Sequence, residues 1–174
     1  MTLPADQIET LEFERKYLIP HECIAAAIGC LGAYCRTDER FPASEVHSIY
    51  FDTPGLRLLQ EKSDGDLYKT KVRLRWYEDP EAGPVESTSF LEVKRRVGAR
   101  RLKWRRRVDL EAAWLSQARL TETRLRAALD RIEIDPTVAV AGLRPVLVVK
   151  YLRHRWVDPV TGARVCLDRS ISVP

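Results

Sequence analysis

The sequence is short of the features that mark several large classes of proteins. It has no run of about 18 apolar residues, the length that a membrane-spanning helix needs, and its longest apolar run covers only residues 24–31. The amino terminus also has no basic stretch followed by an apolar stretch, the pattern of a secretory signal. We therefore expect no transmembrane segment in this chain and a cytoplasmic location.

Cysteine and histidine are scarce as well, with four and three residues. The cysteines form no Cys-x-x-Cys pair, so they indicate neither a zinc site nor a disulfide framework. We expect them to be small buried hydrophobic residues in a reducing compartment. The histidines are scattered, and their positions suggest no Ser-His-Asp or Cys-His arrangement.

What the sequence does contain is typical of one globular domain. It has 174 residues, of which 45% are hydrophobic and 31% charged. Its formal net charge of +4 is unevenly distributed, because residues 69–107 hold 13 basic and 5 acidic residues whereas the rest holds 16 basic and 20 acidic. A basic block of this kind suggests an anionic partner.

The pattern of elements predicts an α+β fold. Alternating side chains predict strands at 11–19, 46–51, 67–77, 87–97, 101–110, 145–157 and 163–171, and Gly98-Ala99 is a hairpin signal. Helical spacing predicts helices at 21–35, 56–62, 111–116 and 121–132. Because helices do not alternate strictly with strands, we expect an antiparallel barrel of about seven to eight strands with peripheral helices.

Most of these predicted strands have one charged and one apolar face, because successive side chains of a strand point to opposite sides. Trp76 and Trp104 fall on apolar faces, where core packing is expected. The charged faces carry mainly cations: Lys69, Lys71, Arg73, Arg75, Lys94, Arg96, Arg101, Lys103, Arg105, Arg107, Arg153 and Arg155. They could simply face water, but like charges opposite one another on paired strands are destabilising. We expect instead a barrel with the cations inside, where Arg and Lys bind a phosphate-rich ligand.

Several motifs carry a family resemblance. Glu12-Phe-Glu14-Arg-Lys16 is an E-x-E-x-K element like that of the CYTH-like triphosphate tunnel metalloenzymes. Segments 14–19, 48–53, 71–77, 90–95, 145–151 and 164–168, in this order, closely resemble the VTC domain, the polyphosphate polymerase branch of that superfamily. The resemblance covers residues from about 10 to 171 and so treats the chain, 1–174, as one domain.

The resemblance implies a phosphotransferase that moves the γ-phosphoryl group of ATP onto inorganic polyphosphate with Mn²⁺ or Mg²⁺. Together with the charged faces, it assigns three groups of site residues. The expected catalytic residues are Lys16, Arg73, Arg75 and Lys94, and the expected phosphate-binding residues are Lys71, Lys103, Arg105, Arg153 and Arg164. The expected metal ligands are Glu12, Glu14 and Glu92, whose carboxylates could alternatively compensate the charge of neighbouring cations.

Family members usually continue past the Leu167-Asp168 strand, whereas this sequence ends at Pro174. We therefore expect a barrel that lacks its usual last strand, with an open edge that a partner chain could complete. Two other functions stay open: a non-catalytic module that binds polyphosphate or inositol phosphates, and a triphosphatase or nucleotidyl cyclase. Nucleic-acid binding is disfavoured, because Trp76 and Trp104 are not expected beside the cations.

Overall fold

The computed structural model describes residues 7–8, 14–81, 89–98, 100–130 and 142–174. The strands are β1 (Gln7–Ile8), β2 (Arg36–Thr37), β3 (Ala43–Asp52), β4 (Tyr68–Glu78), β5 (Ser89–Val97), β6 (Arg100–Val108), β7 (Arg144–Val157) and β8 (Arg164–Ser172). The helices are the 3-10 turn η1 (His21–Cys23), α1 (Ile24–Tyr34), α2 (Arg57–Ser63), α3 (Ala112–Leu115) and α4 (Thr123–Asp130). In these described residues no helix is both long and apolar enough to cross a membrane.

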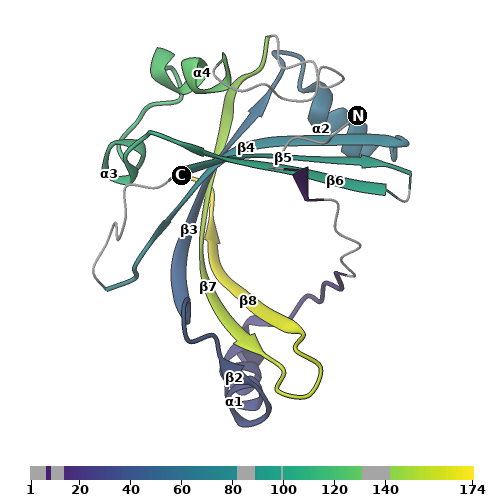
Figure 1. Ribbon diagram of the computed structural model, residues 1–174, viewed down its shortest axis with the longest axis vertical. Coiled ribbons are helices and arrows are strands. Elements are labelled where there is room, and N and C mark those ends of the chain that lie inside the picture. Colours follow the sequence, from purple (N-terminus) through teal and green to yellow (C-terminus); the bar gives the residue numbers. More distant parts are fainter. Residues whose placement is uncertain (1–6, 9–13, 82–88, 99, 131–141) are drawn as a thin grey trace.

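All eight strands belong to one antiparallel sheet. Its order is β1-β6-β5-β4-β3-β7, and β7 pairs with both β2 and β8. The sheet curls into a half-barrel, with β4, β5 and β6 on one wall and β3, β7 and β8 on the other (Figure 1). The predicted antiparallel α+β architecture is therefore confirmed.

The apolar face of the sheet forms the hydrophobic core. Ile49, Leu74 and Trp76 have at most 1% of their surface exposed, and Trp104 belongs to the same cluster. Residues of α3 and α4, including Leu125 with none of its surface exposed, pack into it. Helices thus cover the apolar face, as predicted, and the two tryptophans lie in the core.

The predicted first strand at 11–19 is wrong in its described part. Residues 14–20 have no regular secondary structure, and all are exposed; residues 11–13 lie outside the described residues. Tyr17 and Leu18 have no apolar surface to cover them, at 76% and 103% exposure. Alternating side chains reveal an extended backbone, but a strand also needs a free neighbouring edge to supply its hydrogen bonds. Among the described residues near this end of the chain, only Gln7 and Ile8 pair with β6.

Helix α1 forms where predicted, but its apolar residues are not in the core. None of its residues is buried, and the aromatic ring of Tyr34 is largely exposed. The expectation that the cysteines are buried is also wrong, because Cys23, Cys30 and Cys166 are exposed and Cys35 is half-buried. Helical spacing identified the helix correctly, but spacing does not say whether another element packs against it.

A buried carboxylate at the end of β3 fixes the position of α2. Asp52 Oδ1 accepts hydrogen bonds from the backbone N–H groups of Thr53 (2.7 Å) and Leu58 (2.9 Å), and Oδ2 accepts one from Leu59 (3.0 Å). These donors include N–H groups at the start of α2, which lack partners inside the helix. From α2, Glu61 then accepts a hydrogen bond from the backbone N–H of Thr70, which ties the helix to β4.

Candidate functional site: a cationic face of the curled sheet

Basic side chains gather on the sheet face opposite the core. We call this the cation face and define it by Lys71, Arg73, Arg75, Lys94, Lys103 and Arg105. These residues alternate along their strands with buried core residues such as Val72, Leu74 and Val93. The strand register places Tyr50, Arg73, Glu92 and Arg105 in one row across β3, β4, β5 and β6.

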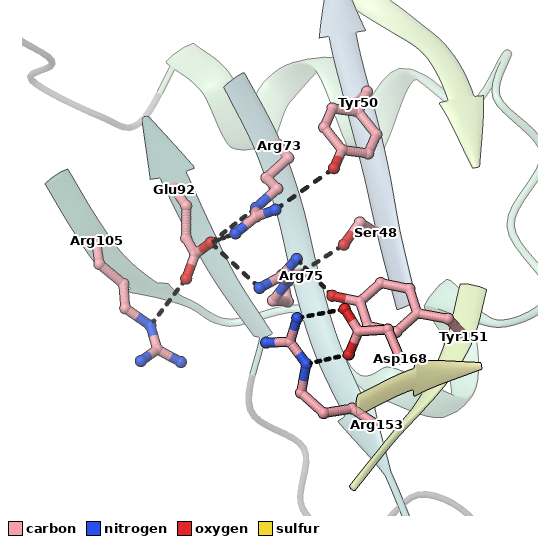
Figure 2. A network of polar contacts seen from close by, with 9 residues as sticks. All are labelled: Ser48, Tyr50, Arg73, Arg75, Glu92, Arg105, Tyr151, Arg153 and Asp168. Carbon is pink, nitrogen blue, oxygen red and sulfur yellow. Dashed lines mark hydrogen bonds and ion pairs between the residues drawn. The ribbon is translucent and has the colours of Figure 1, made fainter. Parts of the chain in front are cut away.

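Glu92 lies at the centre of this face and is surrounded by arginines (Figure 2). Its Oε2 accepts two hydrogen bonds from Arg73, from Nε at 2.8 Å and from Nη2 at 2.6 Å. Arg75 lies 3.9 Å from Oε2, and Arg105 Nε lies 3.4 Å from Oε1. The Glu92 side chain is only 3% exposed, so one buried carboxylate is shared by three guanidinium groups.

The curl of the sheet brings side chains together from strands that are not neighbours. Arg75, on β4, donates a hydrogen bond from Nη2 to Tyr151 Oη on β7 at 3.2 Å, although β3 lies between the two strands. In a flat sheet these backbones would be about 10 Å apart. Arg75 Nε also donates to Ser48 Oγ on β3 at 3.2 Å. The sheet is curled (Figure 1), and three arginines of the cation face converge on Glu92 (Figure 2).

A second ion pair borders this network. Arg153 on β7 holds Asp168 on β8 through two hydrogen bonds, Nε to Oδ1 at 2.6 Å and Nη2 to Oδ2 at 2.7 Å. This bidentate contact raises the pKa of Arg153 above its ordinary value. The Arg153 charge is thus already balanced by a carboxylate, unlike the surplus around Glu92.

Three lysines form a second row beside the arginines. Lys71, Lys94 and Lys103 face one another across β4, β5 and β6, and none of them makes an ion pair with a described residue. Desolvation and then the positive charge of Arg73 and Lys103 lower the pKa of Lys94. Desolvation, followed by the charge of Lys62, likewise lowers the pKa of Lys71. Burial is the largest cause of both shifts, and the charges of neighbouring cations add to it.

Acidic groups on this face respond to the same positive field. Burial would raise the pKa of Glu92, but the charges of Arg73 and Arg75 outweigh burial and hold it below its ordinary value. The pKa of Tyr50 is also lowered, because Arg73, which donates a hydrogen bond to its hydroxyl at 3.4 Å, outweighs the effect of burial. At Glu92 and Tyr50 the face therefore stabilises negative charge, whereas burial raises the pKa of Tyr151 despite the nearby Arg75 and Arg153.

The remaining predicted residues lie at the margin of the site. Lys16 makes an ion pair with Glu14 at 3.5 Å, and both side chains are largely exposed. Their charges nevertheless reach the lysine row. Lys16 adds to the lowering of the pKa of Lys71, and Glu14 opposes the lowering of the pKa of Lys94. Arg164 is exposed at the start of β8, outside the network of Figure 2, and Glu12 lies outside the described residues.

Four residues of the network were not among the predicted site residues: Ser48, Tyr50, Tyr151 and Asp168. The alternation that identified the basic residues could have identified Ser48 and Tyr50 as well, because both share a face of β3. The contact of Tyr151 with Arg75 depends on the curl of the sheet, which no local pattern reveals.

Two places could hold a metal ion. On the cation face the fit is limited, because Glu92 is already neutralised by arginines, whereas Glu14 offers exposed oxygen atoms. A second cluster, Glu45, His47 and Glu78, brings three ligand atoms within 4.8 Å of one another on the opposite face. None of these three residues was among the predicted site residues.

The geometry is that of a polyanion-binding surface. Three arginines surround the Glu92 carboxylate and three lysines lie beside them, and all six cations come from three adjacent strands. Arginine can hold two phosphate oxygens at once, and lysine adds a compact charge.

Comparison with known proteins agrees with this architecture. The family model described as "VTC domain" matches residues 11–173. A crystal structure of a "putative adenylate cyclase" from Bacillus halodurans superimposes with a TM-score of 0.53 and 16% identity, over 96% of this chain and 72% of that one. Such low identity supports a shared fold alone. A search of the curated proteins gave no match.

Proposed function

The chain belongs to the VTC domain family, and from that premise we propose that it is an ATP–polyphosphate phosphotransferase. In the proposed reaction, the γ-phosphoryl group of ATP is transferred to the end of a polyphosphate chain that lies along the cation face. The bond from the γ-phosphorus to the bridging oxygen of ADP breaks, and a bond to a terminal oxygen of the polyphosphate forms.

The observation that carries the proposal is the surplus of positive charge around Glu92. Three arginines share this single buried carboxylate, and three lysines beside them have no partner among the described residues. Such an arrangement is unfavourable in a sheet that has only a structural role. A triphosphate or polyphosphate would supply the missing negative charge.

The arrangement also suits the chemistry of phosphoryl transfer. The protein must hold the donor and the acceptor in line and stabilise charge that spreads over the phosphate oxygens. Arg73 and Arg75 are fixed by Glu92, Ser48 and Tyr151, so little reorganisation would accompany the reaction. We assign them to the transferred phosphate, with Lys16 and Lys94, and assign Lys71, Lys103, Arg105, Arg153 and Arg164 to the chain.

A divalent metal would supply further neutralisation of the phosphate charge. Glu14, and Glu12 outside the described residues, would hold it together with the phosphates, because Mg²⁺ and Mn²⁺ commonly use one or two carboxylates plus substrate oxygens. For Glu92, the three arginines favour charge compensation over a role as metal ligand.

The test is to identify the product formed from ATP and Mn²⁺ by the purified chain. We expect long-chain polyphosphate, detected by gel electrophoresis, and its loss in Arg75→Ala and Lys16→Ala. Arg106→Gln is the matched control, because Arg106 lies on β6 but on the opposite face from Arg105. Orthophosphate or cyclic AMP as the sole product would refute the polymerase and indicate a triphosphatase or cyclase.

A second candidate is a polyphosphate- or inositol-phosphate-binding module without turnover. The observation that favours it is the exposed segment with Glu14 and Lys16, which is not part of the sheet. Tight polyphosphate binding without any product in the same assay would decide for this module. A partner chain along the open edge and a cytoplasmic location remain predictions.

A further inference from the structure

We propose that Glu45, His47 and Glu78 form a Zn²⁺ site on the core-facing side of the sheet, separate from the cation face. His47 Nε2 lies 3.3 Å from Glu45 Oε2 and 3.6 Å from Glu78 Oε2. Tetrahedral zinc with bonds of about 2.0–2.2 Å places neighbouring ligand atoms about 3.3–3.6 Å apart. Both distances from His47 Nε2 therefore match those between zinc ligands, and all three ligand atoms lie within 4.8 Å of one another.

The two carboxylates of this cluster carry negative charge that a bound cation would balance. Glu45 and Glu78 are direct cross-strand partners of β3 and β4, and like charges in that position repel each other. A neutral imidazole carries at most one proton on Nε2, so it can donate a hydrogen bond from this atom to just one of two carboxylates at a time. Lys150 faces His47 from β7 and adds positive charge near Glu78, but it makes no ion pair with either carboxylate in the described structure.

The ligands are held by their surroundings as in an organised metal site. Glu78 Oε1 accepts hydrogen bonds from Trp76 Nε1 at 2.9 Å and from Ser116 Oγ, which leaves Oε2 turned toward His47. The His47 ring stacks on Trp76 at 5.1 Å, and the residue is 8% exposed. Outer contacts of this kind orient metal ligands and strengthen binding.

One side of the cluster is open to solvent, because the Glu45 side chain is 44% exposed. Water could therefore enter as a fourth ligand, which gives tetrahedral coordination. One imidazole and two carboxylates suit Zn²⁺ better than Mg²⁺ or Ca²⁺, which prefer oxygen ligands alone. Bound zinc would link β3 to β4 and, through Glu78 and Ser116, to the end of α3.

The experiment is a titration of the chelator-treated chain with ZnCl₂ by calorimetry, without nucleotide. We expect one zinc per chain, with a dissociation constant of about 1 µM or tighter. Glu78→Gln and Glu45→Gln should each weaken binding by at least about tenfold, and His47→Gln by more. Glu45 is the safest variant for folding because it is the most exposed of the three.

His154→Gln is the matched control, since His154 stacks on Trp156 much as His47 stacks on Trp76. This variant should bind zinc like the unmodified chain. X-ray absorption should show only nitrogen and oxygen ligands. Sulfur ligands would place the zinc at the exposed cysteines and overturn the proposal. Unchanged zinc binding in Glu45→Gln and Glu78→Gln would also overturn it, and so would tighter binding of Mn²⁺ than of Zn²⁺.

Discussion

Replacing Glu92 by Gln should lower the free energy of unfolding, but the variant should still bind polyanions. The Glu92 carboxylate is 3% exposed and accepts hydrogen bonds of 2.6 and 2.8 Å from Arg73, whose side chain is 14% exposed. Removing one member of a buried ion pair costs about 3–5 kcal/mol, because the other charge stays buried without a partner. Gln keeps an acceptor oxygen, so we expect about 3 kcal/mol, or roughly 6–12 °C in Tm.

The assay is thermal unfolding followed by circular dichroism, with and without tripolyphosphate. If the arginines lack negative charge, the ligand should stabilise Glu92→Gln more than the unmodified chain, because it replaces the lost carboxylate. Glu39→Gln, at an exposed position, is the control and should change stability by less than about 0.5 kcal/mol. Unchanged stability in Glu92→Gln would contradict the role of Glu92 as a buried ion-pair partner. Equal stabilisation of both proteins by tripolyphosphate would contradict the excess of positive charge around it.

Three further predictions concern Glu92, the two lysines Lys71 and Lys94, and Asp52. The free energy of unfolding should fall as pH drops below about 4–5, because the pKa of Glu92 is lowered in the folded state and protonation breaks its ion pairs. Acid titration monitored by fluorescence should show a smaller loss of stability in Glu92→Gln than in the unmodified chain. The pKa values of Lys71 and Lys94 are lowered in the free protein, and a bound anion should raise them. Tripolyphosphate should therefore bind with proton uptake, which calorimetry in buffers of different ionisation enthalpy would measure. Its binding should also weaken as pH rises toward about 10, because the lysines lose their charge. Asp52→Ala should cost about 2–4 kcal/mol in urea unfolding, because three backbone N–H groups lose their acceptor; an unchanged midpoint would contradict the anchoring of α2.

Much of the cation face could be predicted from local sequence. The side-chain alternation of a strand is geometric, so Arg73 and Arg75 had to share a face once their segment was identified as a strand. The buried Trp76 on the other side confirms that choice of faces. Strand order, by contrast, depends on which edges meet in space, and here β7 returns to pair with β3 across nearly a hundred residues.

Contacts that depend on tertiary structure were not predictable in this way. Tyr151 reaches Arg75 because the sheet curls, and Glu45 reaches Glu78 because of the register between β3 and β4. The 14–20 segment shows the opposite error: its charges alternate like those of a strand, but it lies exposed outside the sheet. Local patterns specify a backbone conformation, whereas pairing depends on the rest of the chain.

We expect the phosphates to bind at the cation face, which includes Arg73, Arg75 and Arg105. The most direct measurement is a calorimetric titration of tripolyphosphate into Arg105→Gln and Arg106→Gln, which remove the same charge from opposite faces of β6. Losing one charged contact from a partly exposed arginine should cost about 1–2 kcal/mol, so Arg105→Gln should bind roughly 5–30-fold more weakly and Arg106→Gln should bind normally. Equal weakening by both variants would contradict the account.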